Sequence, residues 1–213
     1  MASQTENKYL ADFDNLHVIG TELYSRYTNG ELSKEEVLEQ IQDWIIAGFS
    51  IGTQLGLEDL DSDEVGYLFF KNMASSGVFL PIVQEVTNRK IDDQTTEERV
   101  YQHLENKDGA SSIEKVMETE YHHAANKGIQ TVGDTFSSSA QEIEKTWKTM
   151  LDEKVRDTHT YLEGITIPLG SEFYTYNGDH AMFPGEFDVA EEDCNCRCRI
   201  KLSIKKAQTV TGK

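Results

Sequence analysis

The chain has 213 residues, of which 38% are hydrophobic and 27% charged, a composition typical of a globular protein with one sizeable core or two modest ones. It contains no run of about 18 apolar residues that would cross a bilayer, and its first residues lack the basic start and apolar middle of a signal peptide. We therefore expect a protein that is made and kept in a cytoplasm, with cysteines present as thiols rather than as an extracellular disulfide framework.

The formal net charge of -18 is unevenly distributed along the chain. Residues 194–213 contain basic but no acidic side chains, so residues 1–193 carry 14 basic and 38 acidic ones, a net charge of -24. An acidic body argues against general wrapping of nucleic acid, because non-specific affinity comes from neutralising phosphates with Lys and Arg. Two interpretations remain open: a solvated surface that keeps the protein soluble, or an acidic face that docks on a basic partner.

Helical signals dominate the first half of the chain. Apolar residues three and four apart predict a helix over 9–27, and Ser33 with Glu36 forms a capping box that starts a second one. The buried face of this second helix is expected to hold Val37, Ile41, Trp44, Ile45 and Gly48. A box from Asp61 to Glu64 predicts a third helix, interrupted around residues 75–77 and at Pro81, and residues 93–106 predict one more. The loop at 106–112 suggests a helical domain over 1–107, a second domain over 108–204 and a basic tail over 205–213.

The second half begins with a long helix that follows a capping box at Ser111 and Glu114. Serines at 137–139 then predict another helix that ends at Gly164, with one apolar stripe formed by Trp147, Leu151, Val155, Thr158 and Leu162. After Gly164, short apolar pieces between prolines and glycines predict turns and short strands. The predicted fold class is α+β, with a helical N-terminal half and a C-terminal helix pair packed on a small antiparallel sheet.

All three cysteines lie within five residues near the end of the chain. From Cys194 to Ile204 the even positions are Cys, Cys, Cys, Ile, Leu and Ile, which in a strand places thiols and aliphatic side chains on one face. Cysteine Cα atoms about 6.5–7 Å apart are poorly placed for a disulfide and awkward for two ligands of one metal. We therefore expect buried packing rather than a metal or redox site, although those two alternatives stay open.

Other candidates for chemistry are weak in the sequence. Arg156, His159 and Glu163 would share a helix face and could serve proton transfer or phosphate chemistry, but such charges usually form a solvated or ion-paired face. We expect His159 to be a structural latch between its helix and the following loop. His122 and His123 would point about 100° apart on a helix and could not easily share a metal. The chain contains neither a phosphate-binding loop nor a Gly-x-Ser-x-Gly elbow, so no catalytic residue, metal or cofactor is predicted.

An ordered set of motifs in the second half resembles a known family. The set comprises "TE" at 119–120, "KTW" at 145–147, "DEKVRDTHTYLEG" at 152–164, "FPGE" at 183–186 and "CNCRC" at 194–198. Together these motifs resemble the Mu F-like family of phage minor head proteins, also called the phage head morphogenesis family, over roughly residues 110–204. The resemblance picks out Trp147, Arg156, His159, Leu162, Gly164, Phe173, Pro184, Gly185, Asn195, Cys196, Arg197 and Cys198. Glu118 departs from the pattern, because many relatives have arginine there.

The resemblance implies a low-copy capsid protein rather than an enzyme. Members are associated with the portal vertex, are needed for head assembly and in some cases enter the host with the DNA. The implied partners are the portal protein and capsid or scaffold proteins, and no membrane is implied. The implied location is the virion interior near the portal, and the host cytoplasm during assembly. Packaged DNA is a further candidate partner of the basic tail, through Arg199, Lys201, Lys205 and Lys206. Two alternatives stay open: an enzyme of the nuclease or ADP-ribosyltransferase type, and a zinc-stabilised DNA-binding module.

Overall fold

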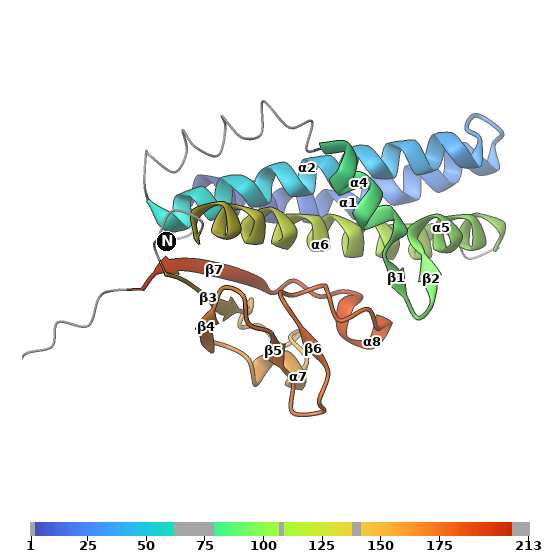
Figure 1. The fold of residues 1–213 in the computed structure, drawn as a ribbon. Helices are drawn as coiled ribbons and strands as arrows, with labels where there is room; N and C mark the ends of the chain where they lie inside the picture. Colours follow the sequence, from blue (N-terminus) through green and yellow to red (C-terminus); the bar gives the residue numbers. More distant parts are fainter. Residues whose placement is uncertain (1–2, 62–78, 107–108, 138–141, 206–213) are drawn as a thin grey trace, which may run out of the picture.

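The computed structural model describes residues 3–61, 79–106, 109–137 and 142–205, and within these it has a layer of long helices above a small β-rich layer (Figure 1). The helices are α1 (Gln4–Thr28), α2 (Lys34–Leu60), α4 (Phe79–Asn88), α5 (Thr96–Glu105), α6 (Gly109–Ser137), α7 (Asp157–Thr160) and α8 (Ala190–Asp193). The strands are β1 (Lys90–Ile91), β2 (Gln94–Thr95), β3 (Ile143–Lys148), β4 (Thr166–Pro168), β5 (Phe173–Tyr174), β6 (His180–Ala181) and β7 (Arg199–Ile204).

The N-terminal helices begin where polar caps satisfy free backbone N–H groups. The predicted capping box at Ser33 and Glu36 is confirmed at the start of α2, and Thr95 with Glu98 forms a second box at the start of α5. The predicted buried face of α2 is also confirmed, with Trp44 packed at its partly buried margin. Asp61 ends α2 in a left-handed conformation, and the rest of the helix predicted from that position up to residue 78 lies outside the described residues.

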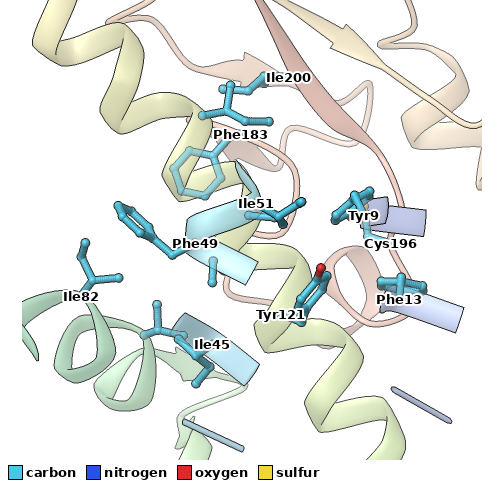
Figure 2. Packing of buried hydrophobic residues seen from close by; sticks show 14 of the residues in the cluster. Tyr9, Phe13, Ile45, Phe49, Ile51, Ile82, Tyr121, Phe183, Cys196 and Ile200 are labelled. Carbon is cyan, nitrogen blue, oxygen red and sulfur yellow. The ribbon is translucent and has the colours of Figure 1, made fainter. Parts of the chain in front are cut away.

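Helices α2 and α6 pass very close to each other along a series of glycines. A Cβ atom added at Gly52 would lie 1.9 Å from the Ala125 carbonyl oxygen, and one added at Gly128 would lie 2.4 Å from the Phe49 carbonyl oxygen. Only glycine allows this approach, because any side chain would meet backbone rather than a flexible neighbour. Figure 2 shows the result, with side chains of α1, α2 and α6 such as Tyr9, Phe49 and Tyr121 in one cluster.

The helix predicted over 137–164 is wrong. Residues 143–148 instead form β3, the central strand of an antiparallel sheet with the order β4-β3-β7, in which Trp147 faces Ile200 and Lys145 faces Leu202. Ile143, Lys145 and Trp147 are buried at alternate positions, as in a strand. The sequence therefore fits both this two-residue period and the predicted helical stripe, and pairing with β7 favours the strand. Leu151, assigned to the same stripe, is 77% exposed. The α+β class and the helical N-terminal half are confirmed, but the helix pair is reduced to the single long helix α6.

The C-terminal segment is shorter as a strand than its alternating pattern predicts. Strand β7 begins at Arg199, so all three cysteines precede it. The inward face is confirmed for Cys196, Cys198, Ile200 and Leu202, whereas Cys194 is only partly buried and Ile204 is exposed. Turns and short strands after Gly164 are also as predicted.

The division into domains at residue 107 stays a prediction. Helix α6 packs on both α1 and α2, and buried residues from the helices and the sheet form one cluster. No helix among the described residues is long and apolar enough to span a membrane.

Candidate functional site

Several residues of the family-like motifs meet in one buried cluster between β3, α7 and the segment before β7. The Trp147 ring is fully buried and lies edge-on to His159 and Phe173, at centroid distances of 5.2 and 5.1 Å. His159 also stacks on Phe187 at 5.5 Å. Leu162 is buried, and the Gly164 N–H, at a φ of 76°, donates to the Trp147 carbonyl oxygen at 2.9 Å. The loop between β3 and β4 is thereby closed onto the sheet.

His159 faces two thiols. Its Nδ1 lies 3.5 Å from Cys196 Sγ and 3.4 Å from Cys198 Sγ, and all three side chains are buried. On its other side, Nε2 lies 3.0 Å from Glu192 Oε2, a close contact that is out of line with the ring N–H and so is not an aligned hydrogen bond. Burial, followed by the neighbouring Cys198, raises the pKa of the Cys196 thiol to about 11. From the sequence, His159 and the three cysteines could supply a zinc set, but the linear spacing lacks paired C-x-x-C knuckles and does not predict this grouping.

Arg156 connects the loop after β3 to the end of α8. Its guanidinium donates to the carbonyl oxygens of Glu192 and Cys194, two acceptors left free at the C-terminal end of the short helix. The predicted trio of Arg156, His159 and Glu163 on one helix face is wrong, because α7 is only four residues long. Glu163 instead pairs with Lys148 and accepts from the Thr149 N–H at 2.5 Å. The three groups therefore form separate structural contacts.

The "FPGE" motif forms a tight turn against α6. Pro184 and Gly185 are buried, Gly185 has a φ of 90°, and its carbonyl oxygen accepts a hydrogen bond from His123 Nδ1 at 2.7 Å. Burial lowers the pKa of His123 well below its usual value, so the ring is a neutral donor. His122 points elsewhere, with Nδ1 2.7 Å from the Tyr9 hydroxyl, consistent with the predicted divergence of the two rings.

A buried network of charges was not predicted from the sequence. Glu120 of α6 pairs with Arg99 of α5 and with Arg89, whose NH1 lies 3.7 Å from Glu120 Oε2. Arg89 also binds Asp188 and Asp193, which joins the helical layer to α8. The motif "TE" at 119–120 includes Glu120. Its partners Arg99 and Arg89 lie 21 and 31 residues away in the chain and have no periodic relation to it.

Lys145 is a buried cation on the inward face of β3. Its ammonium group lies 3.3 Å from Gln130 Oε1 and 5.7 Å from the centroid of the Phe173 ring. Burial lowers its pKa from 10.5 to about 8, against the opposing effects of Glu186, Asp134 and Glu172. A lowered pKa means that the charged form costs about 3 kcal/mol of stability below pH 8.

Substitution of Lys145 by methionine is therefore expected to raise the free energy of unfolding at pH 7, by roughly 1–3 kcal/mol. Between about pH 8 and 10.5 the unfolded chain binds the proton and the folded chain does not, so wild-type stability rises and the gain shrinks. Urea unfolding at pH 7, 9 and 10.5 measures both effects. Lys148→Met on the same strand, which removes a half-exposed ion pair with Glu163, should give no such gain. A Lys145→Met protein that is less stable at pH 7 would contradict the expectation.

The basic residues near the C-terminus differ in their contacts. Arg199 pairs with Glu6 of α1 and lies 3.5 Å from Asp59 of α2, so this guanidinium is used inside the protein. Lys205 pairs with Glu142, and Lys201 is exposed. Lys206 lies outside the described residues. A contact of these residues with DNA stays a prediction, and Arg199 is the least accessible of those that the structure describes.

The remaining two motif residues lie at the protein surface. Arg197 donates from one guanidinium nitrogen, Nη2, to both carboxylate oxygens of Asp152, at 2.7 and 2.8 Å, which holds the loop after β3 against the cysteine segment. Asn195 is exposed at a φ of 57°, a left-handed conformation that asparagine tolerates better than most residues.

The buried motif residues lie within a segment that matches a known family. Residues 82–201 match the model described as Phage Mu protein F like protein, which is more than half of the chain. The chain belongs to the Mu F-like family. The match begins in α4 and ends in β7, so it includes the charge network as well as the cluster around Trp147.

Two characterised proteins share shorter segments with this Mu F-like protein. The minor head protein GP7 of Bacillus phage SPP1 is 34% identical over 58 residues, which are 27% of this chain and 19% of that protein. The NAD(+)--arginine ADP-ribosyltransferase EFV of Enterococcus faecalis is 43% identical over 56 residues, or 26% of this chain and 11% of that protein. The chain thus matches less than a fifth of either relative. No solved structure gives a significant match.

Proposed function

We propose that this Mu F-like protein is a minor capsid protein, present in low copy at the portal vertex and needed for head assembly. The observation that carries the proposal is the family match over residues 82–201, which contains the whole buried cluster around Trp147 and His159. The similarity to a minor head protein of another phage supports the same role. Its place would be the capsid interior near the portal after synthesis in the host cytoplasm, with entry into the host alongside the DNA as a further possibility for this role.

The contacts of the motif residues favour a structural role over catalysis. Arg156 is bound to two backbone carbonyls, and His123 is bound to the Gly185 carbonyl. Glu186 accepts from the Met182 N–H at 3.0 Å, which closes the same turn. Groups held in this way stabilise the fold and have few donors or acceptors left for a substrate. The enzyme named among the relatives shares only a segment that is 11% of its own length, so its activity is not transferred to this chain.

The acidic body would bind a basic surface of the portal or of a scaffold protein. A net charge of -24 over residues 1–193 provides long-range attraction to such a surface, and that attraction weakens with salt. The exposed lysines Lys201 of β7 and Lys205 of the tail would contact packaged DNA, whose phosphates carry the opposite charge. The acidic body and the basic lysines would therefore bind different partners, and salt would weaken both interactions.

Coexpression with the portal protein of the parent phage tests this function. We expect the protein to copurify with portal rings at a few copies per ring, with binding that weakens between about 50 and 300 mM salt. Phage that lack the protein should produce defective heads, and a plasmid copy should restore them. As a matched control, Lys201→Gln and Lys205→Gln should leave portal binding unchanged. Absence of binding to both portal rings and procapsids would overturn the proposal.

A further inference from the structure

The grouping of His159 with Cys196 and Cys198 has the geometry of metal ligands. The three ligand atoms lie within 4.8 Å of one another, and Nδ1 is 3.5 and 3.4 Å from the two sulfurs. Zinc bonds of about 2.3 Å to sulfur and about 2.0 Å to nitrogen, at a tetrahedral angle, place the two ligand atoms about 3.5 Å apart. The observed separations match this value, so one ion could contact all three atoms with little movement.

Hydrogen bonding alone accounts poorly for the arrangement. A ring nitrogen has either one hydrogen or one lone pair in its plane, so Nδ1 of His159 can form only one good hydrogen bond, yet two thiols face it at nearly equal distances. Both thiols are almost fully buried, at 4% and 2% exposure, so bulk solvent does not supply the second partner in either case. A shared cation satisfies the nitrogen and both sulfurs at once.

The surroundings of His159 also fit a ligand. Histidines that bind a metal through one nitrogen generally present the other to a carboxylate, which orients the ring. Here Nε2 lies 3.0 Å from Glu192 Oε2, and the same oxygen accepts from the Thr158 hydroxyl at 2.9 Å. The side chains of His159 and Glu192 are only 2% and 4% exposed. A small turn of the ring would align this contact as a hydrogen bond and fix Nδ1 toward the sulfurs.

His122 is the residue placed to complete a set of four. Its Nδ1 is held at 2.7 Å by the Tyr9 hydroxyl, so Nε2 is the ring nitrogen left to bind a metal, and Asn126 Nδ2 lies 3.2 Å from both this Nε2 and the Cys198 carbonyl oxygen. The Asn126 amide thus has two backbone carbonyls as other acceptors. The ligand atom of His122 lies outside the group of three, so Nε2 has to approach the ion.

Cys196 and Cys198 are not held at the spacing of a regular strand. Two cysteines on one face of a regular strand would have parallel side chains about 6.5–7 Å apart, but Cys196 and Cys198 precede β7. Asn195, at a φ of 57°, breaks the extended course of the chain beside Cys196. The two sulfurs lie at nearly equal distances from His159 Nδ1 and so face the same point, as ligands of one ion require.

We propose that His159, Cys196 and Cys198, with His122 as the fourth ligand, bind one zinc ion in a closed structural site. Two thiolates and two imidazoles in a tetrahedral set select zinc over calcium and magnesium, which bind oxygen ligands. The ion would join α6, α7 and the cysteine segment, which are separate in sequence. The site is independent of portal binding, so it is tested on the purified protein.

Metal analysis of the full-length protein, purified under reducing conditions without chelator, should give about one equivalent of zinc. Replacement by Co²⁺ should give the absorption of a tetrahedral site with sulfur-to-cobalt charge transfer. Cys196→Ser, Cys198→Ser and His159→Gln should each lower the metal content to below about 0.2 equivalents. Cys194→Ser is the matched control, because Cys194 lies in the same segment but outside the group, and it should retain one equivalent.

The wild-type measurements keep the test decisive even where a variant fails to fold. Folded protein that takes up neither Zn²⁺ nor Co²⁺ at micromolar concentrations would overturn the proposal, and so would a native Cys196–Cys198 disulfide found by mass spectrometry. His122→Gln should weaken zinc binding by at least about 10-fold, and unchanged affinity would remove His122 from the ligand set.

Discussion

Replacement of Glu120 by alanine is expected to lower the free energy of unfolding by about 3–5 kcal/mol, because it leaves two buried guanidinium groups without their shared carboxylate. Glu120 is fully buried, and the side chains of Arg89 and Arg99 are 7% and 8% exposed. Arg89 keeps Asp188 and Asp193, whereas Arg99 loses its paired acid. Urea unfolding followed by circular dichroism measures the loss.

Glu118→Ala is the matched control for Glu120→Ala, since it removes a carboxylate two residues away on the same helix. Burial and the neighbouring Glu114 raise the pKa of Glu118, so its charge is disfavoured in the folded protein and its removal should cost less than about 0.5 kcal/mol. Glu120→Gln keeps the shape and one acceptor and should fall between the two. Equal unfolding midpoints for Glu120→Ala and Glu118→Ala would show that the network contributes nothing to stability.

Most of the helical layer could be predicted because its signals are local, although α6 begins at Gly109 and the capping box predicted at Ser111 and Glu114 is wrong. Ser33 with Glu36 specifies where α2 begins, and a 3.6-residue period gives the face that it buries. The close passage of α2 along α6 could not be predicted, although Gly48, Gly52 and Gly56 recur at four-residue spacing on one face of α2. Glycine at that spacing lowers helix propensity, and its role, to let the α6 backbone come close, is visible only once the partner helix is known.

The candidate site was predicted as a set of residues but not as an arrangement. The motifs identified Trp147, His159, Cys196 and Cys198, and burial of Trp147 and the two thiols is confirmed. Their arrangement depends on β3 pairing with β7, more than 50 residues later in the chain, which no local pattern specifies. The stretch around Trp147 satisfies a helical and an alternating pattern at once, so its structure is decided by that distant partner.

Loss of the Trp147 side chain is the second large effect that we expect, with Trp147→Ala lowering the free energy of unfolding by about 3–5 kcal/mol. The ring is fully buried and contacts His159, Phe173 and Phe187, at centroid distances of 5.2, 5.1 and 6.0 Å. Its removal leaves a cavity beneath the sheet that surrounding rings cannot fill without leaving their own contacts. Circular dichroism is the measurement of choice, because Trp44 also contributes to fluorescence.

Trp147→Phe separates the packing of the ring from its polar atom. The indole Nε1 has no hydrogen-bond partner among the described residues, so phenylalanine removes an unsatisfied buried donor while it loses part of the ring volume. These effects oppose each other, and we expect a net loss of at most about 1.5 kcal/mol. Tyr176→Ala, at a ring that is 58% exposed, should cost about 0.5 kcal/mol or less. If Trp147→Ala were as stable as Tyr176→Ala, the cluster around Trp147 could not be the core that holds β3, α7 and the cysteine segment together.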